Sequence, residues 1–488
     1  MEPVLGGIEP GLLWKHFDEL RKIPRCSKHE ERAARYVVGV ARRLELEYEV
    51  DAVGNVVMRK PATSGYEGSP TVVLQSHLDM VCEKNKDVDH DFEKDPIEVV
   101  RDGDYLHARG TTLGADNGVG VSAALAVLED LRAVHGPLEL LFTVDEEEGM
   151  TGAYGLGEGS VRGRQMINLD TEDPHSIYVG CAGGENMLIH LPVSWERASG
   201  AVLSASLGGL KGGHSGVDIH LERGNAVKLL GRVLWEANEE VPLRLAAIGG
   251  GYKHNAIPRE AEAVVIVSED DAEALGSRIK KSEAVLRAEY KKIDPGLRVG
   301  VEVVPAPLPD RVITIEGSKR VLDLMRALPN GIGRWSSEIE DLVETSDNLS
   351  ILETGDDIFF LVSVRSSSES QLRSLADEVR AVARLAGAKV SAGNAYPGWQ
   401  PDLDSKMLRA CRSAYEELFG RQPALKAIHA GLETGIIGQK FPEMEMVSIG
   451  PRVKHPHSPD ERVKISSVVE FYELLLRSLA KIAKMNPG

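Results

Sequence analysis

The segment from residue 71 to residue 80 places an apolar run directly before a polar cluster, Thr71-Val72-Val73-Leu74-Gln75-Ser76-His77-Leu78-Asp79-Met80. A short apolar run of this kind is typical of a buried strand. Alternate residues of an extended segment project to the same side, so His77 could ligate a metal while Asp79 approaches the other ring nitrogen. A histidine and an aspartate near a turn are common on protein surfaces, and this motif alone is weak evidence of a site.

Strand and helix patterns alternate around this segment. Apolar residues recur at helical spacing over residues 12–20 and 33–44, and a Gly-rich turn precedes the helix expected at 123–128. Short apolar runs at 138–144 and 166–169 predict further strands. This alternation predicts an α/β domain with a mixed, largely parallel sheet.

A chain of 488 residues is too long for one hydrophobic core. From about residue 201 the order strand, helix, strand, strand, helix, strand can be traced twice, over 202–304 and 311–390. This order predicts an α+β domain made of two βαββαβ-like halves. We therefore expect an α/β domain formed by residues 1–188 and 396–488, with residues 189–395 inserted as a separate domain.

Four further polar clusters follow apolar runs in the segments assigned to the α/β domain. They are Gly114-Ala115-Asp116-Asn117-Gly118, Asp145-Glu146-Glu147-Glu148, Asn168-Leu169-Asp170 and Pro456-His457-Ser458. Open parallel sheets place ligand sites beyond the carboxyl ends of their strands, so these clusters should meet at one edge. Asp116 could instead be an ordinary N-cap, and the acidic run a solvated loop. Repulsion among clustered carboxylates is nevertheless best offset by a bound cation.

The residue types of these clusters indicate the kind of metal. Histidine and carboxylate ligands without cysteine favour zinc, manganese or cobalt over a structural thiolate zinc site. The residues alone do not decide which of Glu146, Glu147 and Glu148 would be a ligand. The four cysteines are far apart, form no CxxC pair and are expected to be reduced thiols, namely Cys26, Cys82, Cys181 and Cys411.

Composition excludes several classes of partner. The 57 basic and 75 acidic residues give a net charge of −18, and no basic block with interleaved aromatics appears, so nucleic acid is not expected to bind. The first residues, Met1-Glu2-Pro3-Val4, lack the features of a signal peptide. No apolar run reaches the ~18–20 residues that span a bilayer. We therefore expect a cytoplasmic protein without a membrane partner.

The motifs also resemble those of a known family. The segments SHLDM, GADNG, DEEEGMTGA, INLDTED and PHSPDE, in this order and with a large insertion before the last, resemble the M20 metallopeptidases, specifically the cytosolic aminoacylhistidine (Xaa-His) dipeptidase branch. Similar segments of that branch are found at 134–139, 209–216, 255–260 and 429–433. The resemblance covers nearly the whole chain.

This resemblance implies a catalytic α/β domain, an inserted lid domain and two divalent metal ions, zinc or alternatively cobalt or manganese. The implied ligands are His77, Asp116, Glu147, Asp170 and His457. Asp116 would bridge the two ions, His77 and Asp170 would serve one, and Glu147 and His457 the other. Glu146 would be the general base, and Asp79 the carboxylate that orients His77.

The resemblance also implies substrate-binding residues in the lid domain. His214 matches a lid histidine that stabilises the oxyanion, and Arg365 a lid arginine that pairs with the substrate carboxylate. Asn255 is a third candidate, and Glu433 a candidate for binding the substrate's amine. The ordinary alternatives are a turn histidine and a strand-end arginine. A homodimer is implied too, in which His214 acts in its own site or in that of the partner subunit.

The function implied is hydrolysis of short peptides, in particular Xaa-His dipeptides including β-alanyl-histidine. A tripeptidase or an N-acyl amino acid deacylase of the same family would retain the metal site. A glycosidase would use two carboxylates but leave His77 and His457 without a role. A catalytically silent metal-binding protein would have no use for Glu146 as a base.

Overall fold

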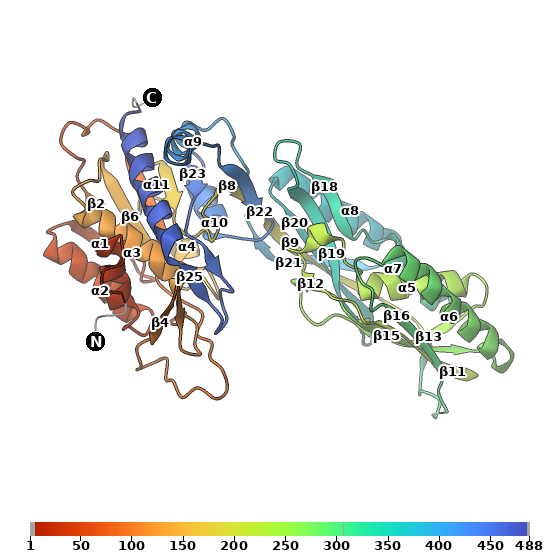
Figure 1. Ribbon diagram of the computed structural model, residues 1–488. Helices are drawn as coiled ribbons and strands as arrows, with labels where there is room; N and C mark the ends of the chain where they lie inside the picture. Colours follow the sequence, from red (N-terminus) through yellow and green to blue (C-terminus); the bar gives the residue numbers. More distant parts are fainter. Residues whose placement is uncertain (1–4, 306, 486–488) are drawn as a thin grey trace. The chain divides into compact units, whose positions relative to one another are not determined.

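The structure is a computed structural model that describes residues 5–305 and 307–485 (Figure 1). The first four residues, on which the prediction of a missing signal peptide rests, lie outside the described residues. The chain divides into two compact units. Unit 1 comprises Met1–Gly180, Pro401–Ala427 and Leu432–Gly488, and unit 2 comprises Cys181–Gln400 and Ile428–Gly431. Among the described residues, no helix is both long enough and apolar enough to cross a membrane.

Unit 1 is built on an eight-stranded sheet with the order β1-β2-β6-β3-β7-β23-β8-β22. The strands are β1 (Glu47–Val50), β2 (Val56–Lys60), β3 (Val72–His77), β6 (Leu138–Thr143), β7 (Gln165–Asn168), β8 (Ser176–Cys181), β22 (Ala424–Ile428) and β23 (Glu445–Ser448). Strands β6, β3, β7 and β23 are parallel to one another, whereas β1, β2 and β8 pair antiparallel with their neighbours. The predicted mixed, largely parallel sheet is confirmed.

The central strands of unit 1 are buried on both faces. Every residue of β3 and β6 is buried, which explains their near-continuous apolar sequence. The helices are α1 (Gly11–Leu20), α2 (Glu31–Arg43), α3 (Ala115–Glu129), α4 (Thr151–Gly155), α9 (Lys406–Phe419), α10 (Glu433–Lys440) and α11 (Ile465–Ala483). Helix α3 packs against β3 and α1, and α11 packs against α9 (Figure 1). A smaller four-stranded sheet has the order β24 (Val453–Lys454), β25 (Arg462–Lys464), β5 (Tyr105–Ala108) and β4 (Val99–Asp102).

The register of the parallel strands places their carboxyl ends at one edge. His77 pairs with Thr143, Gln75 pairs with Asn168, and Asn168 pairs with Ser448. The loops that follow these strands therefore begin side by side, which is the arrangement that the sequence predicts for a ligand site.

Unit 2 is built on a nine-stranded antiparallel sheet. Its order is β16-β11-β15-β13-β19-β20-β9-β21, and β18 pairs with β19. The strands are β9 (Gly183–Leu191), β11 (Ala201–Gly208), β13 (Arg244–Gly250), β15 (Ala261–Val267), β16 (Arg298–Val303), β18 (Gly331–Trp335), β19 (Val343–Thr354), β20 (Ile358–Ser366) and β21 (Lys389–Tyr396). Helices α5 (Ala226–Asn238), α6 (Ala272–Glu289), α7 (Ile315–Ala327) and α8 (Glu369–Leu385) cover one face of it (Figure 1).

The two predicted halves are present in this sheet, but the first strand of the second half comes from elsewhere. The first half has the strand order β16-β11-β15-β13. The second half has the corresponding strands in the reverse order across the sheet, β19-β20-β9-β21. Strand β9 thus takes the place that β11 has in the first half. The strand predicted at 311–314 is only β17 (Val312–Ile313), which pairs with β10 (Trp195–Glu196) outside the main sheet. Because β9 already pairs with both β20 and β21, no position remains there for β17.

The expectation that all four cysteines are reduced thiols is wrong for two of them. Cys26 and Cys82 form a disulfide with a Cα–Cα distance of 5.6 Å and a sequence separation of 56. The fold brings the two thiols together, because the backbone of Cys26 forms an isolated parallel β-bridge with Met80, which lies two residues before Cys82. Among the described residues, Cys26 and Cys82 are the only disulfide pair, and Cys181 and Cys411 are buried elsewhere.

Removing this disulfide should destabilise unit 1. In the chain-entropy description, closing a loop of this length restricts the unfolded chain by about 4 kcal/mol. We expect Cys26→Ser combined with Cys82→Ser to unfold at a lower denaturant concentration, as followed by circular dichroism. Wild-type protein measured with a reductant should match the double variant. Equal unfolding midpoints for wild type and double variant would contradict the expected contribution.

Candidate metal centre

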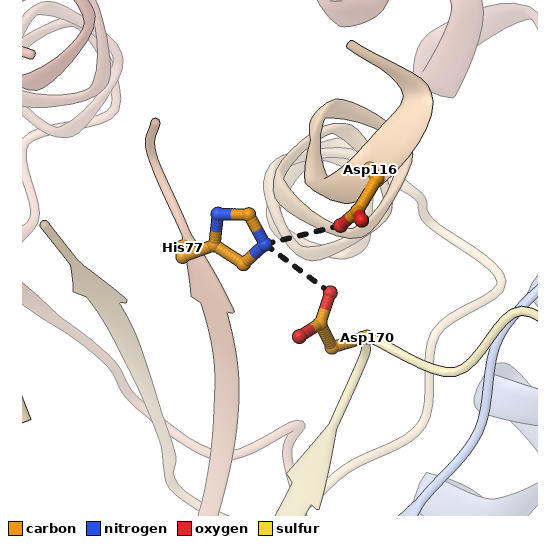
Figure 2. Close-up of side chains that lie close together, drawn as sticks. All are labelled: His77, Asp116 and Asp170. Carbon is orange, nitrogen blue, oxygen red and sulfur yellow. Dashed lines mark hydrogen bonds and ion pairs between the residues drawn. The ribbon is translucent and has the colours of Figure 1, made fainter. Parts of the chain in front are cut away.

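His77 is the last residue of β3 and is held between carboxylates. Its side chain is 1% exposed, and its Nδ1 lies 3.2 Å from Oδ1 of Asp79. Its Nε2 lies 3.1 Å from Oδ1 of Asp116 and 3.3 Å from Oδ1 of Asp170. Figure 2 shows His77 facing both carboxylates. One ring nitrogen therefore faces the proposed orienting carboxylate, while the other faces two candidate ligands.

Asp116 stands at the start of α3, where its carboxylate does not cap the helix. Its φ and ψ of −79° and 112° are extended, as is common for N-cap residues, but its side chain is turned to the imidazoles of the site. While Oδ1 faces His77, Oδ2 lies 3.2 Å from Nε2 of His457, which is 341 residues away in sequence. The two oxygens of one carboxylate thus face two different imidazoles. The ordinary N-cap alternative does not describe this residue.

The acidic run after β6 separates into four different environments. Glu147 lies with Oε2 3.0 Å from Nε2 of His457, whereas Glu148 is exposed and pairs with Lys28. Asp145 is buried, with Oδ2 accepting a hydrogen bond from the hydroxyl of Thr151. The carboxylate of Glu146 can share a cation with His77 and Glu147, because one donor atom from each lies within 4.8 Å of the others.

Two loops of the site are tied together by Asp79. Its Oδ1 and Oδ2 accept hydrogen bonds from the backbone N–H groups of Glu146 and Glu147, at 3.1 Å each, in addition to the contact with His77. Asp170 is held in a similar way, because the amide of Asn117 donates to its Oδ1 at 2.5 Å. These contacts fix the candidate ligands through neighbouring polar groups, as is usual at metal sites.

The site carries more negative charge than its imidazoles balance. Burial opposes a charged imidazole at His77, but the carboxylates of Asp170, Asp116 and Asp79 outweigh it and hold the pKa of His77 well above its ordinary value. Hydrogen bonds to Asp116 and Glu147 raise the pKa of His457 to about 11. Without a metal ion, protons therefore occupy the ligand atoms that a cation would need.

Burial has the opposite consequence for the carboxyl groups. It raises the pKa of Asp170 to about 7, with a further contribution from the charge of Asp116. Burial, supported by the charges of Asp170 and Glu433, also raises the pKa of Glu146 well above its ordinary value. A cation would favour the ionised form of its carboxylate ligands and so reverse the cost of burying them.

The residues present fit a pair of divalent cations. Three groups of donor atoms lie within 4.8 Å of one another, namely His77–Asp116–Asp170, Asp116–Glu147–His457 and His77–Glu146–Glu147. The first two groups share Asp116, whose oxygens point apart. In addition, Oε1 of Glu147 is buried and has no hydrogen-bond partner within residues 5–305 and 307–485. An oxygen-rich donor set with imidazoles and no thiolate suits zinc, cobalt or manganese.

Sequence reasoning assigned no role to Glu461, which organises the loop of Asp116. Its carboxylate accepts hydrogen bonds from four consecutive backbone N–H groups, those of residues 113–116, at 2.7–3.3 Å. The only sequence signal was its place in the quoted segment PHSPDE. Glu172 was missed as well; burial, with the charges of Asp116 and Asp170, raises its pKa to about 8.

The three predicted substrate residues lie in unit 2. His214 belongs to β12 (Gly213–His214), which pairs with β14 (Ala256–Ile257). Its Nδ1 accepts hydrogen bonds from the backbone N–H groups of Gly216 and Val217, so Nε2 carries the proton of the neutral ring. Burial and the charge of Arg365 lower the pKa of His214 to about 4, which keeps the ring neutral at pH 7. His214 is therefore an N–H donor there.

Arg365 is a buried cation in β20. It is 5% exposed, its Nη1 donates to the hydroxyl of Tyr396 at 2.5 Å, and its Nε has no hydrogen-bond partner among the described residues. A buried guanidinium with an unsatisfied N–H is suited to binding an anion. Asn255 is half-buried, and its backbone carbonyl accepts from the N–H of Ser215, next to His214.

Comparison with known proteins covers nearly the whole chain. Residues 73–481 match the family model described as Peptidase family M20/M25/M40. The chain is 43% identical over 482 residues to the cytosol non-specific dipeptidase of Escherichia coli (strain K12), covering 98% of this chain and 99% of that protein.

Two solved structures are similar to different degrees. The crystal structure of aminoacylhistidine dipeptidase from Vibrio alginolyticus has a TM-score of 0.92 at 41% identity and covers 98% of both chains. The aminopeptidase PepT from Bacillus cereus ATCC 10987 has a TM-score of 0.55 at 16% identity, covering 98% of this chain and 100% of that one, and shares the fold alone.

Proposed function

The chain belongs to peptidase family M20/M25/M40, and we propose that it is a dipeptidase that acts with two bound divalent cations. It is a peptide-bond hydrolase, and the relatives similar over its full length are named as dipeptidases. The observation that carries the proposal of two cations is the carboxylate of Asp116, whose two oxygens face His77 and His457 separately.

We assign the ligands from the two donor groups that share Asp116. His77 and Asp170 would hold one cation and Glu147 and His457 the other, while Asp116 belongs to both donor groups and offers one oxygen to each. Asp79 orients His77 from behind. Zinc is our proposal for the metal, with cobalt or manganese as alternatives that the same donor set accepts.

Glu146 is proposed as the general base. When bound, the two cations would polarise the substrate carbonyl and lower the pKa of a water molecule. Glu146 would take the proton of that water and return it to the leaving amine. Its neighbours in the acidic run are engaged elsewhere, because Glu147 contacts His457, Glu148 pairs with Lys28, and Asp145 contacts Thr151.

Two residues of unit 2 are proposed to bind the substrate. His214 would donate from Nε2 to the oxyanion, which needs a neutral ring with its proton on that nitrogen. The two backbone hydrogen bonds that Nδ1 accepts support this tautomer. Arg365 would pair with the substrate carboxylate, for which a guanidinium is well suited. Asn255 is proposed as a further contact. Glu433 is proposed as a contact for the amine, since its Oε1 is buried and has no hydrogen-bond partner in the described part of the chain.

We propose Xaa-His dipeptides, including β-alanyl-histidine, as substrates within a broader dipeptide range. The Vibrio alginolyticus protein is named for aminoacylhistidine and the Escherichia coli protein as non-specific, so both ranges have support. A cytoplasmic location is supported by the name of the Escherichia coli protein, although disulfides such as Cys26–Cys82 are rare in that compartment. A homodimer stays a prediction.

A substrate panel tests the proposed activity. Metal-loaded enzyme should hydrolyse β-alanyl-histidine, α-linked Xaa-His dipeptides and other dipeptides, with much lower kcat/KM for tripeptides and N-acyl amino acids, because both charged ends of a dipeptide are bound. Chromatographic measurement of released amino acids gives the values. Highest kcat/KM on tripeptides or on N-acyl amino acids would replace the proposal by a tripeptidase or a deacylase.

Changing Arg365 tests how the substrate carboxylate is bound. Arg365→Ala should raise KM for dipeptides by about 10–100-fold, because the enzyme loses at least one charge-assisted hydrogen bond to the substrate. We expect a smaller effect on kcat. Dipeptide amides should be affected far less, because they lack the charged partner. Arg373→Ala, which removes an exposed arginine of α8, is the control. Equal effects of Arg365→Ala on acids and amides would remove Arg365 from this role.

A further inference from the structure

Arg25 is a buried arginine whose guanidinium donates to backbone carbonyls of two separate segments. It is 3% exposed. Its Nη1 donates to the carbonyl oxygens of Leu78 at 3.0 Å and Asp79 at 2.7 Å, and its Nη2 donates to that of Gly114 at 2.5 Å. The guanidinium therefore forms a direct tie between two loops of unit 1.

These two loops carry the proposed ligands. Leu78 and Asp79 directly follow His77, and Gly114 lies two residues before Asp116. His77 and Asp116 are 39 residues apart in sequence, and the tie formed by Arg25 links their segments on the backbone. A guanidinium presents its donors in a rigid planar fork, so it fixes both segments at once, which the single flexible ammonium of a lysine does not do.

Two glycines of the motif GADNG leave room for this guanidinium. A Cβ on Gly114 would lie 2.5 Å from Nη2 of Arg25, and a Cβ on Gly118 would lie 2.8 Å from the same atom. Gly114 also has a φ of +69°, which disfavours other residues. The motif therefore allows close approach of Arg25 as well as placing Asp116.

The segment that carries Arg25 is itself fastened to the loop after β3. The carbonyl of Arg25 accepts a hydrogen bond from the N–H of Met80 at 3.1 Å, and the hydroxyl of Ser27 donates to Oδ2 of Asp79 at 2.7 Å. The disulfide between Cys26 and Cys82 adds a covalent link. The guanidinium is thus held in place from its own backbone.

We propose that Arg25 is a positioning residue of the metal centre, which holds the loop after β3 and the start of α3 so that His77 and Asp116 can ligate the same cation. This inference rests on the proposed function of the site. Among the described residues, the guanidinium of Arg25 hydrogen-bonds to the backbone of the ligand loops and to none of the proposed ligand atoms. Its loss should therefore weaken metal retention and lower kcat, while KM stays nearly unchanged.

The test compares Arg25→Lys and Arg25→Met with wild type in the cobalt-loaded holoenzyme. Cobalt retention is measured by competition with a chelator, and the visible cobalt spectrum reports ligand geometry. We expect both variants to retain cobalt about 10–100-fold less tightly, with an altered spectrum. Arg32→Lys and Arg32→Met are the matched controls, because Arg32 is exposed and donates to the carbonyl of Glu93 away from the site. They should behave as wild type.

A second variant keeps the test decisive where Arg25→Met fails to fold. Gly118→Ala pushes a methyl group toward Nη2 without changing Arg25, and it should shift cobalt retention and the spectrum in the same direction. Wild-type retention and spectrum in folded Arg25→Lys and Gly118→Ala would overturn the proposal. Failure of the wild type itself to bind two cobalt ions would refute the dinuclear site instead, so the two failures are distinguishable.

Discussion

Glu146→Gln is expected to lower kcat by at least about 10²–10⁴-fold, the range of general acid–base catalysis, while the enzyme keeps both metal ions. Glutamine preserves the shape of the side chain but can no longer take a proton from water. The ligand groups of the two ions do not require Glu146, since His77, Asp116 and Asp170 form one and Asp116, Glu147 and His457 the other. Steady-state kinetics and elemental analysis of the same preparation check both halves of this expectation.

Two neighbours of Glu146 provide matched controls. Glu148→Gln removes an exposed carboxylate that pairs with Lys28 and should leave kcat unchanged. Glu147→Gln removes the carboxylate beside His457 and should reduce metal content as well as activity. Loss of metal in Glu146→Gln, to the level seen in Glu147→Gln, would make Glu146 a ligand rather than a base. Unchanged turnover would place the base elsewhere.

The edge of the sheet at which the site forms could be predicted because short apolar runs and their polar ends are local features. His77 ends the buried run Val72–His77, and the acidic cluster begins two residues after the buried run Leu138–Thr143. Each polar group therefore lies at the carboxyl end of a strand, which is where parallel sheets place ligand sites. Local spacing also placed His77 and Asp79 on one side of an extended segment, where they are in contact. The confirmed α/β class follows from the same alternation.

Contacts between distant segments could not be predicted from periodicity. His457 meets Asp116 across 341 residues, and no spacing rule connects them. The residues alone left Glu146, Glu147 and Glu148 equivalent, whereas the structure separates them by their partners. The disulfide between Cys26 and Cys82 was missed for the same reason, since only the fold brings the two thiols together.

The order of the strands and the backbone contacts of buried charged side chains could not be predicted from the sequence either. Strand β9 completes the second half of unit 2 although it precedes the first half in sequence. The sequence pattern therefore predicts the first strand of the second half at 311–314 instead. Arg25 and Glu461 carry no motif of their own. Arg25 donates to backbone carbonyls, and Glu461 accepts from backbone N–H groups. A pattern of side chains in the sequence does not predict such contacts with the backbone.

Asp116→Asn should reduce bound metal from two ions per chain to one or none and lower kcat by about 10³-fold or more. The asparagine side chain keeps one acceptor oxygen but replaces the other with an amide group that cannot ligate a cation. Loss of the bridging charge also leaves the two ions without their shared counter-charge. A catalytic metal usually stabilises the transition state by several kcal/mol. Each ~1.36 kcal/mol of activation free energy corresponds to a tenfold change in rate.

Wild-type enzyme stripped by a chelator is the reference for this variant. Stripped wild type should be inactive and regain activity on adding zinc, cobalt or manganese, whereas Asp116→Asn should stay impaired in excess metal, because the missing group is part of the protein. Asp104→Asn is the control, since Asp104 accepts from the N–H of Ser466 at the start of α11 and lies outside the donor groups. Two tightly bound ions in Asp116→Asn would rule out a bridging carboxylate, and hydrolysis by stripped wild type would rule out the metal mechanism altogether.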